Sequence, residues 1–290
     1  MPKELERYKQ IERSIITTYR KTIWSPFVLA VKKYHLIDEG DKIAVCISGG
    51  KDSMLLAKLM QELHRHSEVN FGLVFLVMDP GYNAANRKRI EENAALLQVP
   101  VEIFETDVFA ASIAAGGDSP CYLCARMRRG YLYNFAKQLG CNKIALGHHY
   151  DDVIETILMG MLWGSQVQTM MPKLHSTNFP GMELIRPMYL IREDDIKAWR
   201  DANDLHFIQC ACRFTDTCTT CRPNEEAKSK RQQTKQLIRE LKKTNPEVEA
   251  HIFRSMENVC LDTVIAYKTG GRKISFLENY DRPRKSGETE

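Results

Sequence analysis

The sequence has no feature that would place the chain in or across a membrane. None of its apolar runs approaches the ~20 residues that a membrane-spanning helix needs. The N-terminal segment, MPKELERYKQIER, is charged throughout and has no apolar core, which argues against a secretory signal. We therefore expect a cytoplasmic protein with no membrane partner. The chain also has no internal repeat, and its charged and apolar fractions of 27% and 43% are ordinary for a soluble globular protein.

The chain lacks a strong overall charge, since its formal net charge is only +4. This value does not by itself predict a nucleic-acid-binding protein, but the charge is unevenly distributed. Residues 227–243 contain many lysines and arginines and a single glutamate. Such clusters suit a phosphate backbone, and a solvated helix face is the alternative interpretation. The candidates for binding a nucleic acid are Arg126, Arg128, Arg129, Lys228, Lys230, Arg231 and Lys235.

Cysteine is the unusual component of the composition. The chain has nine cysteines, and structural disulfides are not expected in a reducing compartment. Six of the nine lie in two places, which indicates metal or sulfur chemistry: Cys121 and Cys124, then Cys210, Cys212, Cys218 and Cys221. Cys46, Cys141 and Cys260 have apolar neighbours in the sequence and are expected to be buried thiols.

Strands and helices are expected to alternate through the middle of the chain. The strands are apolar throughout, which is typical of a parallel sheet covered on both faces, so the fold class is α/β and Rossmann-like. We expect strands at 42–48, 72–79, 101–105, 143–147 and 183–186, and helices at 52–66, 84–97, 120–140, 151–163 and 193–203.

The two ends of the chain differ in pattern from the middle. Residues 1–37 have the spacing of one or two helices, and no strand alternation follows residue 204. The chain therefore divides into a helical region 1–37, a nucleotide-binding domain 38–204, a C-terminal region 205–280 and a disordered tail 281–290. Within the C-terminal region we expect a cysteine-rich loop, a basic helix at 225–244 and a shorter helix at 251–262.

The most informative stretch is KIAVCISGGKDS at residues 42–53, where a buried strand ends in a glycine-rich turn before a helix. Two glycines let the backbone N–H groups converge, and the helix N-terminus adds partial positive charge, so the turn suits a phosphate. The spacing is neither the Walker form nor the dinucleotide form. Lys51 is the natural partner of the phosphates, and Ser48, Gly49, Gly50, Asp52 and Ser53 complete the loop.

Two further segments are expected beside this loop, because ligands of such sheets bind beyond the carboxyl ends of the strands. Asp79 ends the second strand and is expected either to meet the nucleotide or to cap the strand. Gly147 and His148 precede Asp151 and Asp152 at the start of a helix. These two carboxylates are either helix caps or magnesium ligands for a bound triphosphate.

Cys121 and Cys124 follow Ser119 and Pro120, which mark the start of a helix. The two thiols are then one turn apart on one face, and the helix N-terminus with nearby arginines favours the thiolate. A redox dithiol, half of a zinc site and two ligands of an iron–sulfur cluster remain open on this pattern alone.

SGGKDS resembles the PP-loop of the ATP-pyrophosphatase superfamily, whose fold is of the HUP type and whose members adenylate a substrate while releasing pyrophosphate. With C-x-x-C, then G-H-x-x-D-D and a later cysteine region, the chain resembles the tRNA 2-thiocytidine synthetase (TtcA) family over about residues 25–277. Arg186-Pro187, the helix with Ser229, Arg231 and Lys235, and residues 253–259 also match.

The resemblance implies an enzyme that binds ATP, Mg²⁺, a 4Fe-4S cluster and tRNA, and that thiolates an anticodon-loop cytidine at position 32. It implies Lys51, Asp52, Asp151 and Asp152 as catalytic residues, with ATP also meeting Asp79, Gly147 and His148. The cluster ligands are Cys121, Cys124 and Cys210, with Cys212 as the alternative third ligand. Cys212, Cys218 and Cys221 are left as a zinc site, a sulfur relay or loop thiols without a role.

The resemblance leaves several alternatives open. The sulfur donor is a cysteine desulfurase or free sulfide, and a homodimer is one option for the assembly. Rival functions are a PP-loop thiouridine synthetase, an adenylyl-sulfate reductase, a lysidine-type synthetase and a nucleotide-gated iron–sulfur sensor. The chain has no adjacent Cys-Cys pair and no N-terminal zinc finger, which argues against a reductase and against a thiouridine synthetase.

Overall fold

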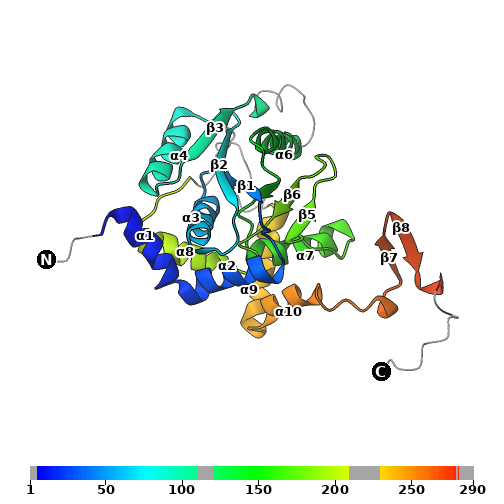
Figure 1. Ribbon diagram of the computed structural model, residues 1–290. Coiled ribbons are helices and arrows are strands. Elements are labelled where there is room, and N and C mark those ends of the chain that lie inside the picture. The colour runs from blue at the N-terminus through cyan, green and yellow to red at the C-terminus, as the bar shows by residue number, and fades with distance from the viewer. Residues whose placement is uncertain (1–4, 110–119, 209–228, 279, 281–290) are drawn as a thin grey trace.

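The computed structural model describes residues 5–109, 120–208, 229–278 and 280 (Figure 1). Its centre is a six-stranded sheet with the strand order β3-β2-β1-β4-β6-β5. The strands are β1 (Lys42–Ile47), β2 (Gly72–Asp79), β3 (Val101–Glu105), β4 (Lys143–Ala145), β5 (Lys173–His175) and β6 (Glu183–Ile185).

The sheet is parallel except at one edge. β1, β2, β3, β4 and β6 run parallel, and β5 pairs antiparallel with β6, with Leu174 opposite Leu184. The five predicted strands and their parallel arrangement are therefore confirmed, and β5 was not predicted. An antiparallel edge strand on an otherwise parallel sheet is common in α/β proteins.

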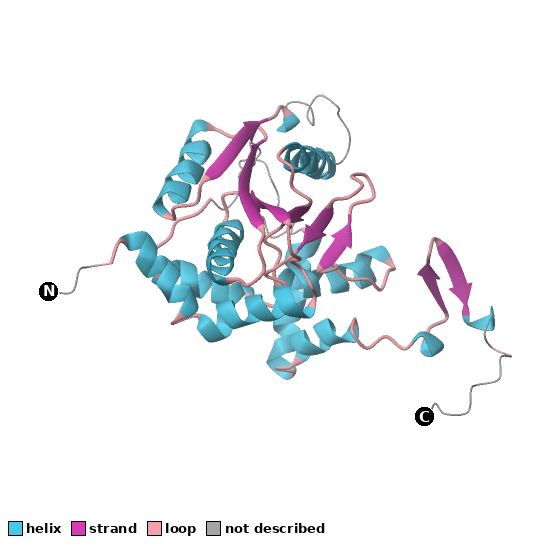
Figure 2. Cartoon of the chain, in the orientation of Figure 1, coloured by secondary structure: helices cyan, strands magenta, loops and turns pink. Residues whose placement is uncertain are grey.

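Helices cover both faces of the sheet, as Figure 2 shows. They are α3 (Lys51–His66), α4 (Ala84–Leu96), α6 (Pro120–Gln138), α7 (Tyr150–Gly164) and α8 (Glu193–Ala202), each within a few residues of its predicted range. Alternate residues of β1 point to opposite faces of the sheet and pack against different helices. Val45 packs in one cluster with Leu59 of α3, and Ala44 packs in another with Ala136 of α6. This alternation is the period-2 pattern of a strand buried on both sides.

The N-terminal region consists of α1 (Arg7–Ile16), a π-helical turn (Arg20–Trp24) and α2 (Ser25–Lys33). Ile11, Ile15, Ile23 and Phe27 are buried in the same cluster as Val45 of the sheet. The predicted helices of residues 1–37 are thus present, and they form part of the layer that covers one face of the sheet (Figure 1).

The C-terminal region contains α9 (Lys230–Thr244) and α10 (Val248–Ser255), followed by β7 (Ala266–Thr269) and β8 (Arg272–Ser275). α9 begins after Ser229, whose hydroxyl accepts the N–H of Gln232 as an N-cap. Phe253 of α10 stacks on Tyr150 with 4.4 Å between the ring centroids, which packs α10 against α7.

Three expectations for this region are wrong. The helix expected at 251–262 lies instead at Val248–Ser255. The only helical turn that the structure describes between it and β7 is a short 3₁₀ turn at Leu261–Thr263. The β7–β8 hairpin was not expected after residue 204. Cys260 is exposed, whereas Cys46 and Cys141 are buried as expected. In the described ranges, no helix has the length and apolarity needed to cross a membrane.

Candidate active site

The loop between β1 and α3 is tightly folded. The N–H and the hydroxyl of Ser48 both approach Ser53 Oγ, at 3.1 and 3.2 Å, and Ser53 Oγ donates to the carbonyl of Gly50 at 3.0 Å. Gly49 has a φ of +81°, and a Cβ there would lie 2.6 Å from Ile90 Cγ1 and 2.7 Å from Ile208 Cδ1. Glycine is therefore required at residue 49 both for its backbone conformation and for the close packing above it.

Lys51 begins α3 and forms two ion pairs. Its Nζ lies 3.0 Å from Asp52 Oδ2 and 3.3 Å from Glu193 Oε1. Glu193 begins α8, and sequence reasoning did not select it. Burial alone would raise the pKa of Glu193, but Lys235, Lys197 and Lys51 hold that pKa well below its usual value. The ammonium group that is expected to meet phosphate therefore lies beside an ionised carboxylate.

The segment from β4 to α7 lies directly against this loop. A Cβ on Gly147 would come within 3.1–3.2 Å of the backbone of Asp52 and Ser53, so the two loops can touch only because residue 147 has no side chain. The N–H of His149 donates to Asp152 Oδ2 at 3.1 Å, as a helix-capping contact. Asp152 thus acts as a cap here, and its role in holding magnesium stays a prediction.

The two acids of α7 have different partners. Asp151 accepts the N–H of Glu193 at 2.7 Å and pairs with Arg192 at 3.2 Å. Asp152 pairs with Arg231 at 2.8 Å. Burial would raise the pKa of Asp152, but His149 and Arg231 keep that pKa below its usual value, so the carboxylate is ionised.

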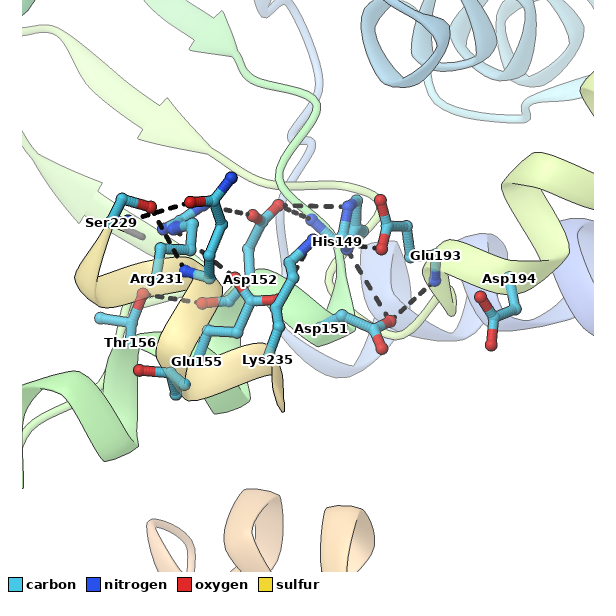
Figure 3. A network of polar contacts seen from close by, with 12 residues as sticks. His149, Asp151, Asp152, Glu155, Thr156, Glu193, Asp194, Ser229, Arg231 and Lys235 are labelled. Atoms are coloured by element: carbon cyan, nitrogen blue, oxygen red, sulfur yellow. Dashed lines mark hydrogen bonds and ion pairs between the residues drawn. The ribbon is translucent and has the colours of Figure 1, made fainter. Parts of the chain in front are cut away.

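Two basic residues of α9, Arg231 and Lys235, point toward these acids (Figure 3). Besides its bond to Asp152, Arg231 lies 3.5 Å from Glu155 Oε2. Lys235 lies 3.4 Å from Glu155 Oε1 and 3.2 Å from Glu193 Oε2. An ion-pair network therefore connects α9, α7 and α8 to Lys51. Arg231 and Lys235 were expected to bind tRNA, and in this structure both form ion pairs with acidic residues of this network. Lys230, another residue expected to bind tRNA, is exposed.

Glu155 is the buried member of this network. Its side chain is 2% exposed, and burial raises its pKa to about 7, against the opposing effect of Lys235 and Arg231. Sequence reasoning did not select Glu155, because its partners come from a helix some eighty residues away in the chain.

Asp79 at the end of β2 caps the following turn. Its Oδ1 accepts the N–H groups of Gly81 and Tyr82 at 2.8 and 2.7 Å, and its Oδ2 pairs with Arg87 at 2.7 Å. Of the two roles expected for Asp79, capping is the one that this structure shows. Contact with a nucleotide stays a prediction.

Two cavities adjoin the loop of residues 48–53, and Asp52 lines both. One, of about 390 Å³, lies at the carboxyl ends of β1, β2 and β4. It is lined by Cys46, Ile47, Ser48, Asp52, Ser53, Met78, Arg128, Arg129, Leu132, Ile144, Leu146, Gly147, His148 and Asp152. The other, of about 580 Å³, lies between Lys51, α8 and residues 204–208. Arg128 and Arg129, which were expected to bind RNA, therefore line the first cavity, and Arg126 is exposed.

One atom in this site is suited to a cation. Asp52 Oδ1 is buried and has no hydrogen-bond partner among the described residues. No group of three or more metal-ligating side chains occurs within those residues. The backbone of α6 places Cys121 and Cys124 in its first turn. Cys210, Cys212, Cys218, Cys221 and Lys228 lie outside the residues that the structure describes.

Comparison with known proteins gives one consistent result. The sequence model of the PP-loop domain family matches residues 21–214. A tRNA-cytidine(32) 2-sulfurtransferase of Alkalilimnicola ehrlichii is 34% identical over 79% of this chain and 70% of its own length. One from Coxiella burnetii is 33% identical over 87% of this chain and 91% of its own length.

A solved structure shows the same fold. It is the U34-tRNA thiolase NcsA from Methanococcus maripaludis with its [4Fe-4S] cluster, which superposes with a TM-score of 0.62 and 20% identity. The match covers 81% of this chain and 77% of that one. At this identity the likeness concerns the fold, which is the α/β, Rossmann-like fold predicted from the sequence.

Proposed function

We propose that this chain, which belongs to the tRNA-cytidine(32) 2-sulfurtransferase family of PP-loop proteins, replaces the C2 oxygen of an anticodon-loop cytidine in tRNA with sulfur at the expense of ATP. The observation that carries the proposal is the cavity at the carboxyl ends of β1, β2 and β4. Ser48, Asp52 and Ser53 of the loop between β1 and α3 line it, together with Arg128, Arg129 and His148.

The cavity suits ATP in its electrostatics. Arg128 and Arg129 line it and offer positive charge to the phosphates, and the N-terminus of α3 adds a partial positive charge. Lys51, the first residue of α3, lines the adjoining cavity of about 580 Å³, and Asp52 lines both cavities. A divalent ion that bridges phosphates takes one or two carboxylates, and Asp52 Oδ1 is buried without a hydrogen-bond partner in the described part of the chain, with Nε2 of His149 3.8 Å away. Asp52, with Asp151 and Asp152 nearby, would therefore hold Mg²⁺.

These groups would act in a reaction of two steps. The C2 oxygen of cytidine attacks the α-phosphorus of ATP, and the bond to the β-phosphate oxygen breaks to release pyrophosphate. A hydrosulfide then adds to C2, and AMP leaves with the former C2 oxygen. Lys51 and the amides of residues 49–53 stabilise the charge that develops on the departing pyrophosphate. The base must be unstacked to be reached, which suits a nucleotide of a loop.

Two contacts near the cysteine positions support a cluster site beside the nucleotide. Arg128 lines the ATP cavity one turn after Cys124 on α6. Ile208, two residues before Cys210, packs against Gly49. Cys121, Cys124 and Cys210, with Cys212 as the alternative, would thus hold a 4Fe-4S cluster. Such a cluster supplies an iron that can carry sulfur for transfer. The sulfur comes from a cysteine desulfurase or from free sulfide, in the cytoplasm.

A reconstituted thiolation assay tests this function. Protein purified without oxygen is incubated with tRNA, ATP, Mg²⁺ and sulfide, and 2-thiocytidine is measured by mass spectrometry after nuclease digestion. We expect product with the wild type and with Lys88→Ala on α4, and none with Lys51→Ala. Cys121→Ala should lose iron and product but still bind ATP. Product formed without iron, or a protein that holds zinc alone, would contradict the cluster.

A further inference from the structure

The β7–β8 hairpin stands apart from the rest of the molecule. In Figure 1 it projects beyond α10, at the end of an extended segment. Gly270 and Gly271 form its turn, with φ values of +54° and +76°. An isolated two-stranded hairpin is only marginally stable in water, so each cross-strand pair in it matters to its stability.

One of these pairs is unfavourable. The antiparallel register places Lys268 directly opposite Lys273. Residues that face each other in this way have Cβ atoms about 4.5–5.5 Å apart, and like charges there destabilise the hairpin. Both lysines are exposed, and no described carboxylate forms an ion pair with either. The third cation of the hairpin, Arg272, is neutralised by Glu278 at 2.9 Å.

The hairpin therefore holds two ammonium groups side by side without a described carboxylate to pair with them, and this arrangement lowers its own stability. Residues 266–275 contain no acidic residue that could relieve the repulsion. An anion held between the two ammonium groups would relieve it. Local conflicts of this kind between a sequence and its own structure are expected where a ligand binds.

We propose that the β7–β8 hairpin is a second contact for the RNA substrate, in which Lys268 and Lys273 bind phosphates of the tRNA backbone. The inference rests on the proposed function, since that function makes tRNA the substrate. Polynucleotide phosphates fit the two lysines better than an acidic protein surface does, because two exposed aromatic rings directly follow β8. Phe276 and Tyr280 are 45% and 73% exposed, and such rings stack on unpaired bases.

The test uses one substitution with two opposite expected effects. Lys273→Glu turns the repulsive pair into an attractive one, so hydrogen exchange at the hairpin amides should slow by up to about fivefold. The same change removes a phosphate contact and adds repulsion. The affinity for tRNA should then fall about tenfold at 0.1 M salt, and the slope of log K against log salt should become shallower by about one.

Lys88→Glu is the matched control. It changes the net charge equally, lies on α4 and is 77% exposed at its side chain. Its affinity for tRNA should stay within about twofold of the wild type, because a charge farther away than the Debye length of about 10 Å is largely screened. An equal loss in both variants would mean a general charge effect and would overturn the proposal.

Other outcomes distinguish a failure of this proposal from a failure of the proposed tRNA thiolation. If the wild type fails to bind or thiolate tRNA, the proposed function fails. If tRNA binds with the same affinity and salt slope in Lys273→Glu, the hairpin is not an RNA contact and only this inference fails. A change of molecular mass in Lys273→Glu with unchanged tRNA affinity would assign the hairpin to a contact between copies of the chain.

Discussion

The Nε–H of Arg186 donates a hydrogen bond to Nδ1 of His148, across 3.4 Å. A guanidinium group is never an acceptor, so Nδ1 of His148 carries no proton and the neutral ring holds its proton on Nε2. Burial and the charge of Arg186 lower the pKa of His148 to about 4, which keeps the ring neutral near pH 7. Asp152, which opposes this shift, and Arg231 and His149, which add to it, are the other charged or titratable groups that act on it.

We predict that His148 acts as a hydrogen-bond donor to ATP through Nε2. Glutamine can place an N–H near the position of Nε2, whereas asparagine places it near Nδ1. The affinity of His148→Gln for ATP should therefore be within about threefold of the wild-type affinity. The affinity of His148→Asn should be about tenfold lower than that of the wild type, which is the effect of losing one hydrogen bond. Isothermal titration with ATP measures both. Equal affinities in the two variants would remove this role.

The steric requirement at Gly49 can be separated from its backbone requirement. Gly181 has the same φ of +81°, but a methyl group at residue 181 would have nothing within 4 Å, whereas a methyl group at residue 49 meets Ile90 and Ile208. Gly181→Ala should cost about 1 kcal/mol for backbone strain, and Gly49→Ala about 2–4 kcal/mol because overpacking is added. Urea unfolding measures both costs. Equal costs would show that Ile208 simply moves aside.

The pH dependence of stability should report the buried Glu155. Its pKa in the folded protein, about 7, lies above the usual 4.5, so the folded state binds more protons than the unfolded state between these values. The free energy of unfolding should therefore fall as the pH rises through this window. Glu155→Gln removes the effect, while Lys235 keeps Glu193 and Arg231 keeps Asp152 as partners.

We expect Glu155→Gln to be more stable than the wild type by about 1–3 kcal/mol at pH 8, with a smaller difference at pH 5.5. Urea unfolding at the two pH values measures this difference. Glu240→Gln, an exposed change on α9, is the control and should show no such trend. A variant less stable than the wild type at pH 8 would mean that the ion pairs outweigh burial.

The cysteines outside the two clusters should differ in reactivity. Burial, with a smaller contribution from Cys141, raises the pKa of Cys46 to about 12, and Cys260 is exposed. Iodoacetamide at pH 8 should therefore modify Cys260 at least about a hundredfold faster than Cys46, because the thiolate is the nucleophile. Peptide mass spectrometry of the folded protein resolves the two sites. Comparable rates would show that β1 opens readily.

The parts of the fold that were predicted from the sequence are those with local signals. The apolar runs identified β1 and β2, and the glycine turn with its lysine identified the phosphate loop. β5 was missed because Lys-Leu-His has no strand pattern of its own and forms only by pairing with β6. The β7–β8 hairpin did have a signal, since two glycines separate two short runs with strand propensity.

The site was predicted only where its residues are close in sequence. Glu193 and Glu155 gain their roles from Lys51 and from Lys235, which lie far away along the chain. The basic character of α9 was plain from the sequence, but the direction of its side chains was not. The direction of these side chains depends on how the helix packs. Ile238 of α9 packs with Val153 and Ile157 of α7, and this contact turns the basic face of α9 toward the acids of α7.

The burial of Ile11, Ile15, Ile23 and Phe27 with Val45 makes the N-terminal helices inseparable from the sheet. A shortened protein that begins at residue 38 would retain every residue proposed to bind ATP. It would nevertheless present a bare apolar face where α1 and α2 now lie. We expect such a protein to aggregate and not to refold, so that the smallest autonomous folding unit for this chemistry includes its first two helices.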